Sequence, residues 1–292
     1  MKRKHYSIPL AITLLLSACG QNNGAESNSQ NSVVCVSESN SQDDNNLFHS
    51  PYKKPTDWET MGLKGKVKKM YISENDNSEF NEEGYFIKHV ESLDALVNVK
   101  LYTYDAAGNL ITRISYDPSC KEQSTMTSQY SYKMIGDTLE VTEKNSTNYG
   151  TDVCKYYYTE GYHCARYSDS NGNSTRYIYD KHGNIIEYVN NDGSSTKNAY
   201  KYDDNDRLIE TAIQDMDEDF ITTKYFYDDA GKLKKTESSS NITNIYNEKG
   251  DIEETISAEG SWKYSYDEKG NLTGYSQNGE KFTTTHQYEY YK

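Results

Sequence analysis

The sequence predicts an all-β protein built from tandem β-hairpins. A nine-residue pattern, Tyr-x-Tyr-Asp-x-x-Gly-Asn-Leu in its clearest form, occurs at residues 102–110, 177–185, 225–233 and 264–272. Helical periodicity of useful length is absent after the first 20 residues, and only 4 of the 292 residues are Pro. These observations predict hairpin repeats that form an elongated, curled antiparallel sheet.

The pattern has the chemistry of a strand, a turn and a second strand. Two tyrosines separated by one residue lie on the same face of a strand. Asp105 can accept hydrogen bonds from backbone N–H groups two residues on, and Gly108 supplies the positive φ of a type I turn with a bulge. Leu110, Thr112 and Ile114 then share one face of the returning strand. We therefore expect one hairpin in each repeat.

The residue at the Asp position marks nine units along the chain. Neighbouring markers are 19 to 28 residues apart, which is enough for two strands of about six residues and two turns. The segment 288–292 resembles the first strand of a tenth unit, and we expect it to close the C-terminal edge of the sheet. The nine markers are Asn81, Asp105, Lys133, Thr159, Asp180, Asp203, Asp228, Asn247 and Asp267.

Residues 1–18 have the features of a lipoprotein signal peptide. A basic start is followed by the apolar run Ile8–Leu16, which is too short to span a bilayer. The run ends in Leu-Ser-Ala-Cys, which resembles a bacterial lipobox and implies cleavage before Cys19 and lipidation of that cysteine. The alternative is an ordinary secretory signal. Lipidation implies a membrane anchor at the outer membrane or cell surface, with the periplasmic face as the alternative location.

Three further regions follow the signal peptide. Residues 19–54 are rich in Asn and Ser, and we expect a flexible tether there. In residues 55–64, Thr56 and Glu59 have capping-box spacing, and Trp58 is expected to cover the first edge of the sheet. In the first strand, Val67, Lys69 and Tyr71 are expected to face away from Met70. The repeat domain covers residues 65–292.

The repeated pattern resembles the YD repeat of RHS and teneurin-like proteins, and the resemblance covers residues 65–292. Large members of that family spiral into a hollow shell, sometimes around a C-terminal toxin. Nine units are fewer than we expect a closed shell to need, and the resemblance maps no catalytic residue onto this chain. It implies the repeat fold alone.

The residues give no support for catalysis, a metal or a cofactor. HExxH, GxSxG, P-loop and CxxC motifs are absent, and we predict a non-enzymatic protein. His182 lies in a turn, where a solvated residue is the preferred interpretation. Residues 215–219 begin like a calcium loop, but Phe220 and Phe226 replace its Gly and Glu, which favours a solvated turn. The net charge of −14 argues against nucleic acid.

The sequence leaves the state of two cysteines, the role of one tryptophan and the choice between two functions open. Cys154 and Cys164 flank Glu160-Gly161 and are expected to face each other, as a disulfide or as two thiols. Trp262 is the candidate for stacking on a ligand.

The first functional hypothesis is a binding or adhesion module for glycan or protein partners. The second is a structural or assembly scaffold of the envelope, accessory to an RHS-type system.

Overall fold

The computed structural model describes residues 47–93, 96–214, 219–281 and 286–292. The chain divides into the units Met1–Leu47 and Phe48–Lys292, and everything below concerns the second. The prediction of an all-β fold is confirmed. The elements are α1 Asp57–Thr60, β1 Val67–Ser73, β2 Asp76–Phe80, β3 Phe86–Leu93, β4 Leu96–Tyr104, β5 Leu110–Tyr116, η2 Pro118–Cys120, α2 Lys121–Ser124, β6 Met126–Ile135, β7 Thr138–Thr147, β8 Gly150–Thr159, η3 Glu160–Tyr162, β9 His163–Asp169, β10 Ser174–Tyr179, β11 Ile185–Asn190, β12 Ser195–Tyr202, β13 Leu208–Gln214, β14 Phe220–Tyr227, β15 Leu233–Ser238, β16 Thr243–Tyr246, β17 Ile252–Ser257, β18 Gly260–Tyr266, β19 Leu272–Gln277, β20 Glu280–Lys281 and β21 Gln287–Tyr290.

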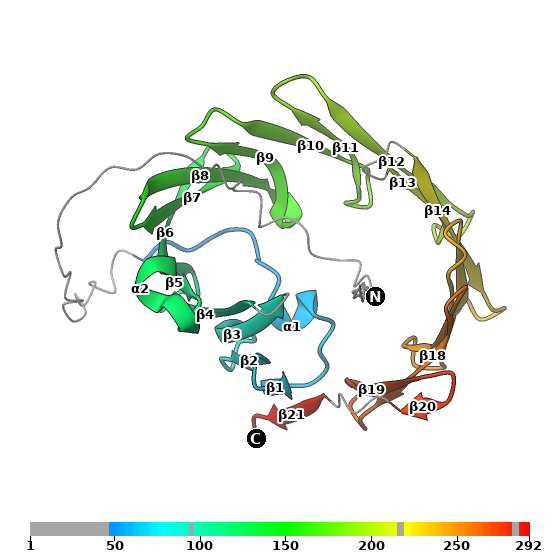
Figure 1. Cartoon of the computed structure of the whole chain (residues 1–292). Coiled ribbons are helices and arrows are strands. Elements are labelled where there is room, and N and C mark those ends of the chain that lie inside the picture. Colours follow the sequence, from blue (N-terminus) through cyan, green and yellow to red (C-terminus); the bar gives the residue numbers. More distant parts are fainter. Residues whose placement is uncertain (1–46, 94–95, 215–218, 282–285) are drawn as a thin grey trace, which may run out of the picture. The chain divides into compact units, whose positions relative to one another are not determined.

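The strands pair antiparallel in chain order, and the two ends of the sheet meet. Each strand from β1 to β19 pairs with the next one along the chain. β21 then pairs with β1, as Figure 1 shows at its lower edge. We expected nine units to be fewer than a closed shell needs, and the structure brings the two ends of the sheet together through the pairing of β1 with β21. Many of the hairpins carry a bulge, and each bulge adds twist and curvature to the sheet.

The turn at Asp105 has the predicted hydrogen bond to the carboxylate and several others. Asp105 Oδ1 accepts from the N–H groups of Ala107 and Asn109, at 2.9 Å each. Asp105 N–H also donates to the Asn109 carbonyl, and Gly108 has φ 82°. The register shifts between Thr103 and Tyr104, which places the bulge at the second tyrosine. The same backbone bonds recur in the turns that begin at Asp169, Asp180, Asp203, Asp228, Asn247 and Asp267.

A hydrogen bond from the second tyrosine of a unit joins neighbouring hairpins. Tyr227 Oη donates to the Leu208 carbonyl at 2.7 Å, at the start of the returning strand of the preceding hairpin. We call this contact the tyrosine bridge. Burial raises the pKa of Tyr179 to about 12, so its hydroxyl remains a donor at neutral pH. The other bridges run from Tyr104 to Phe86, Tyr132 to Leu110, Tyr179 to Cys164, Tyr266 to Ile252 and Tyr288 to Leu272.

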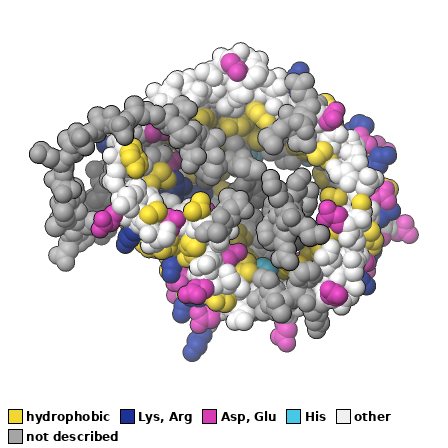
Figure 2. Space-filling view, viewed as in Figure 1, with side chains coloured by type: hydrophobic (Ala, Val, Ile, Leu, Met, Phe, Trp, Pro, Cys, Tyr) yellow, Lys and Arg dark blue, Asp and Glu magenta, His cyan; other side chains and the backbone are white. Residues whose placement is uncertain are grey.

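The two faces of the sheet differ in chemistry. The tyrosines of the repeats lie on the face that we call the inner face. The other face carries charges of alternating sign, as where Glu79 lies between Lys69 and Lys88 on three adjacent strands, with N–O distances of 3.3 and 3.9 Å. Figure 2 shows Lys, Arg, Asp and Glu side chains mainly at the outer margin of the view. These cross-strand pairs keep the outer face hydrated.

The tightest core lies where the ends of the sheet meet. Val67 and Phe80 are fully buried, and Met70 is 6% exposed. Val67 and Met70 share this core because the register shifts between Val67 and Lys69. The predicted alternation of Val67, Lys69 and Tyr71 against Met70 was wrong for that reason. A bulge of this kind leaves no local signature in the sequence.

The short N-terminal cap forms as predicted, but it covers a different part of the sheet. Thr56 and Glu59 make both bonds of the capping box. Trp58 donates from Nε1 to the Val67 carbonyl at 2.8 Å and packs against Phe80, with ring centroids 6.3 Å apart. Gly84 lies directly against the indole, where a Cβ atom would be 2.5 Å from Cε3. Trp58 therefore covers the core, while β21 covers the edge of β1.

Part of the expected tether belongs to the folded unit. Phe48 stacks on Tyr132 with ring centroids 5.9 Å apart, and Asn109 Nδ2 donates to the Phe48 carbonyl at 2.6 Å. Tyr85 Oη donates to the Lys54 carbonyl at 3.3 Å. The boundary at residue 54 was therefore wrong, because inner-face side chains hold the segment from Phe48 onward. Residues 19–46 lie outside the described part of the chain.

Replacing Tyr227 with Phe tests the tyrosine bridge. The change keeps the ring but leaves the Leu208 carbonyl without its donor, so we expect a loss of about 1–2 kcal/mol in the free energy of unfolding. Urea denaturation measures this loss. Tyr225→Phe is the control, because the Tyr225 hydroxyl has no hydrogen-bond partner among the described residues. Equal stability of the two variants would contradict the role of the bridge.

Candidate functional site

A groove of about 590 Å³ lies on the inner face beside the turns that begin at Asn247 and Asp267. Tyrosines enter it from β16 and β18, and charged side chains enter from β15, β17 and the two turns. Figure 2 shows the face on which the hydrophobic side chains gather around the inner margin. The groove is lined by Lys234, Tyr246, Asn247, Glu248, Lys249, Asp251, Glu253, Tyr264, Tyr266 and Asp267.

The tyrosines offer ring faces and one fixed hydroxyl. Tyr264 and Tyr266 lie on the same face of β18 and are half-buried. The Tyr266 hydroxyl is held by the Ile252 carbonyl. Burial, and then the nearby Asp251 carboxylate, raise the pKa of Tyr266 to about 12. Tyr264 lies opposite Tyr275 of the neighbouring strand β19.

The carboxylates of the groove differ in how many of their oxygens already accept a hydrogen bond or form an ion pair. Asp267 accepts from the Tyr290 hydroxyl and from the Asn271 N–H. Burial alone would raise the pKa of Asp267, but the bonds from Tyr290 and the turn backbone outweigh it, so the pKa lies below its usual range. Asp251 pairs with Lys64 through Oδ1, while its buried Oδ2 has no partner among the described residues.

This arrangement suits an uncharged or cationic polyhydroxylated ligand. Tyrosine rings can pack against the apolar face of a sugar ring, and carboxylate oxygens accept hydrogen bonds from its hydroxyl groups. Four carboxylates and two lysines line the groove, so the local charge disfavours anionic ligands. The described residues contain no cluster of three or more His, Cys, Asp or Glu that could hold a metal.

Trp262 lies next to the groove without lining it. It is in β18, opposite Thr255 and Gln277, and it shares the face of Tyr264 and Tyr266. Its side chain is half-buried. We predicted that Trp262 stacks on a ligand, and the structure places it in the aromatic row that continues from the groove along β18.

The two candidate disulfide cysteines do not face each other. Cys154 lies opposite Asp169, and Cys164 lies opposite Tyr158. The turn centres on η3 rather than at the midpoint between the cysteines, which offsets them by four residues along the sheet, or about 13 Å. Cys154 Sγ is 3.6 Å from the Tyr167 hydroxyl. The prediction of facing sulfurs was therefore wrong.

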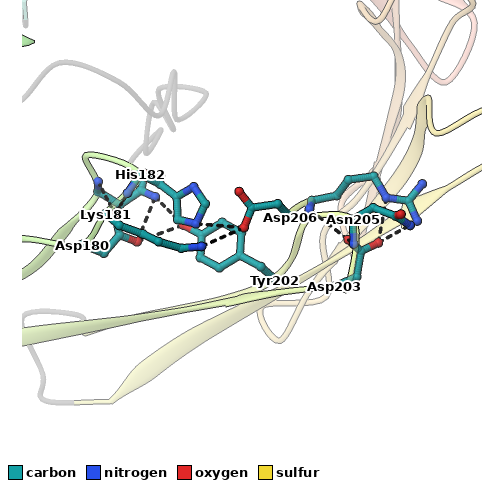
Figure 3. A network of polar contacts seen from close by, with 9 residues as sticks. Asp180, Lys181, His182, Tyr202, Asp203, Asn205 and Asp206 are labelled. Carbon is teal, nitrogen blue, oxygen red and sulfur yellow. Dashed lines mark hydrogen bonds and ion pairs between the residues drawn. The ribbon is translucent and has the colours of Figure 1, made fainter.

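His182 lies at an exposed turn position, as predicted, and its side chain also takes part in a polar network. Its ring stacks on Tyr202 with centroids 4.0 Å apart, and Nε2 is 3.3 Å from Asp206 Oδ1. Lys181 Nζ is 3.1 Å from the same oxygen, as Figure 3 shows. Tyr202 donates to Asp180 Oδ2 at 2.9 Å. The network couples the tips of two consecutive hairpins.

The inner face contains a buried ionic cluster that was not predicted from the sequence. Glu143 is 3% exposed and accepts from Arg113 Nη2 at 2.8 Å and from Tyr130 Oη at 2.9 Å. Glu143 is in phase with the buried residues Leu139 and Val141 of β7. That phase is the signal that could have identified it. The cluster is enclosed by protein, and we assign it to the core.

Ser78, His89 and Glu91 are linked by hydrogen bonds, and these are residue types that occur in the active sites of hydrolases. Ser78 Oγ is 2.8 Å from His89 Nδ1, and His89 Nε2 is 3.2 Å from Glu91 Oε2. The bond to His89, opposed by partial burial, lowers the pKa of Glu91 to about 2. Ser78 is fully buried, so a substrate cannot reach its hydroxyl. We therefore assign the series to the packing of β2 against β3.

Two sequence predictions fall outside the described residues. The first is Cys19 with the signal peptide. The second is the acidic segment 215–218, after which β14 begins at Phe220. Among the residues that are described, no helix is long and apolar enough to cross a membrane.

Comparison with known proteins gives only weak likenesses. No protein-family model and no curated protein matches the chain. The crystal structure of TcdB2-TccC3 matches with 10% identity and a TM-score of 0.34, over 78% of this chain and 16% of that chain. The crystal structure of TcdB2-TccC3-TEV matches with 12% identity and a TM-score of 0.29, over 71% of this chain and 15% of that chain.

A further match is a porin-like protein from Bacteroides uniformis ATCC 8492. Its identity is 13% and its TM-score is 0.31, over 76% of this chain and 97% of that chain. The chain spans only 15–16% of the length of the two TcdB2-TccC3 chains above. Structural similarities this weak do not support an inference about function. The proposed function is therefore based on the groove.

Replacing Asp267 with Asn tests the electrostatics of the groove. The folded carboxyl has the lower pKa, so its stabilising effect is present above the unfolded-state pKa of about 3.9 and is lost as pH falls through the folded pKa. We expect Asp267→Asn to be less stable than wild type by about 1 kcal/mol at pH 7, and the difference to shrink as the pH falls below the unfolded-state pKa and through the lower folded pKa.

Thermal unfolding across this pH range measures the effect. Asp228→Asn is the matched control, because it changes the same turn position and Asn247 shows that Asn can hold this turn. A stability difference that is independent of pH would contradict the electrostatic explanation.

Proposed function

We propose that this protein is a non-enzymatic, lipid-anchored binding module of the bacterial cell envelope. Its repeats are of the YD type found in RHS proteins, on the strength of the repeated Tyr-x-Tyr-Asp-x-x-Gly pattern. Its ligand is an uncharged or amine-bearing glycan chain, held in the inner-face groove. The observation that carries the proposal is the placement of Tyr264 and Tyr266 beside Asp251 and Asp267 in one groove.

Each part of the groove has a role in this proposal. The Tyr264 ring packs against the apolar face of a sugar ring. Carboxylate oxygens accept from the hydroxyl groups of the ligand, which fixes its orientation. Lys234 is held by Glu248 at 2.7 Å, so it is not a free cation for an acidic sugar. The row from Tyr266 to Trp262 gives an extended chain more than one place to stack.

The lipid anchor is the second part of the proposal. The lipobox resemblance at Cys19 supports membrane attachment at the outer membrane or the cell surface. A Cys19→Ser variant should leave the membrane fraction, while wild type stays in it and incorporates labelled palmitate. Digestion of intact cells with a protease that cannot enter the periplasm then separates a surface location from a periplasmic one.

Replacing Tyr264 with Ala tests ligand binding. Full-length protein in detergent is assayed against immobilised neutral, amine-bearing and acidic polysaccharides. We expect saturable binding to a neutral or amine-bearing polymer and about tenfold weaker binding by Tyr264→Ala, since loss of one stacking ring costs about 1–2 kcal/mol. Tyr264→Phe keeps the ring and should bind like wild type.

Tyr225→Ala is the matched control for this test. Tyr225 occupies the same position in its repeat but does not line the groove. Equal losses in Tyr264→Ala and Tyr225→Ala would assign the effect to folding. The absence of binding to every polysaccharide, together with co-purification of envelope proteins, would favour the alternative role of an envelope scaffold.

A further inference from the structure

In eight of the hairpins, a bulge adds one residue near the start of the returning strand, and we call it the bulge residue. In the hairpin of Asp105 it is Ile111, because the pairing moves directly from Thr112 to Leu110. The first five bulge residues along the chain are apolar, the next two are charged and the last is a threonine. In chain order they are Ile87, Ile111, Ala165, Ile186, Ile209, Lys234, Glu253 and Thr273.

The two charged bulge residues coincide with the groove. Lys234 and Glu253 both line it, whereas none of the apolar bulge residues does. Isoleucine occupies four of the eight positions, so the bulge itself accepts an apolar side chain. The charges of Lys234 and Glu253 are therefore not required to form the bulge, and a role in the groove explains them.

Glu253 differs from the other carboxylates of the groove because it is both accessible and unpaired. Its side chain is exposed, so a ligand can reach it. Among the described residues, its carboxylate has no ion-pair or hydrogen-bond partner. The other carboxylates of the lining each have a partner: Glu248 has Lys232 and Lys234, Asp251 has Lys64, and Asp267 has Tyr290.

The negative charge of Glu253 acts inside the groove. The hydrogen bond to Glu248 raises the pKa of Lys234 most, and the Glu253 carboxylate adds to this shift. Glu253 belongs to β17, between the strands that carry Tyr246 and Tyr264. The other lysine of the lining, Lys249, lies in the exposed turn, where solvent and salt screen its charge.

A carboxylate beside tyrosine rings suits a protonated amine. An ammonium group donates charge-assisted hydrogen bonds to a carboxylate, which are stronger than bonds between neutral groups. The faces of tyrosine rings also attract cations. A sugar that carries a free amine satisfies both requirements, whereas N-acetylation removes its positive charge.

We propose that Glu253 makes the groove selective for amine-bearing glycans, by forming an ion pair with the free amine of a sugar ring that packs on Tyr264. This inference rests on the proposed function and narrows its ligand class, because both residues line the same groove. It assigns the stacking ring to affinity and the bulge residue to the choice between charged and neutral sugars.

Titration calorimetry of the full-length protein in detergent with two glucosamine hexamers tests this inference. One hexamer has free amines and the other is fully N-acetylated. The titration is done at about pH 5.5, where amines are protonated and an ordinary Glu carboxylate is ionised. We expect wild type to bind the free-amine hexamer about fivefold more tightly, as one exposed ion pair allows. This preference should decrease as salt is added.

Two substitutions test Glu253 itself. Glu253→Gln removes the charge and keeps the shape, and Glu253→Ile restores the residue that other bulges carry. Both variants should bind the two hexamers equally, with the wild-type affinity for the N-acetylated hexamer. Glu259→Gln is the matched control, because it removes the same charge at an exposed position outside the groove, and it should keep the preference.

The outcomes distinguish this inference from the proposed function. Equal affinity of wild type for the two hexamers would overturn the inference and leave a glycan-binding groove standing. A preference that persists in Glu253→Gln and Glu253→Ile would do the same. Absence of binding to either hexamer would also overturn the inference, and only absence of binding to every polysaccharide tested with Tyr264→Ala would overturn the proposed function as well.

Discussion

The fold depends on a hydrogen bond that recurs along the sheet, from a strand tyrosine to the carbonyl at the start of the returning strand of the preceding hairpin. A bulge at this tyrosine shifts the register of the strand pair, as between Phe226 and Tyr227. The carbonyl at the start of the preceding returning strand, such as that of Leu208, accepts the tyrosine hydroxyl. A buried carbonyl needs a donor, and a phenylalanine ring cannot supply one. The repeat therefore uses tyrosine, which fills the inner face with an apolar ring and joins adjacent hairpins with its hydroxyl.

The same bulge, repeated in hairpin after hairpin, also explains why a sheet of this length meets its own beginning. Each bulge increases the local twist, and the tyrosine bridge fixes the position of one hairpin against the next. The accumulated rotation brings β21 beside β1, where Val67 and Phe80 form the most completely buried core. Closure therefore needs no special segment of its own. It follows from a unit whose local geometry is repeated often enough.

Features that depend on residues close together in the sequence were predicted correctly, and features that depend on distant residues were not. The Asp turns, the positive φ at Gly108 and the capping box at Thr56 depend on residues within five positions of each other, and all were predicted. The contact of Lys64 with Asn271 joins residues 207 positions apart and has no local signature. The register of Cys154 depended on the centre of one turn, which η3 displaced. The groove was missed because its tyrosines are identical in sequence context to those that form the core.

One position of the turn differs between repeats in its hydrogen-bonding chemistry. The fourth residue after the Asp position is Asn in several turns, and its amide donates to whatever lies beside it, namely the Phe48 carbonyl for Asn109 and the Lys64 carbonyl for Asn271. In the turn that begins at Asn247, this position is Asp251, which can only accept. One of its oxygens forms an ion pair with Lys64, and the other has no hydrogen-bond partner among the described residues. A single exchange of donor for acceptor in a repeated turn thus leaves unused hydrogen-bonding capacity at one place in the sheet, and that place is the groove.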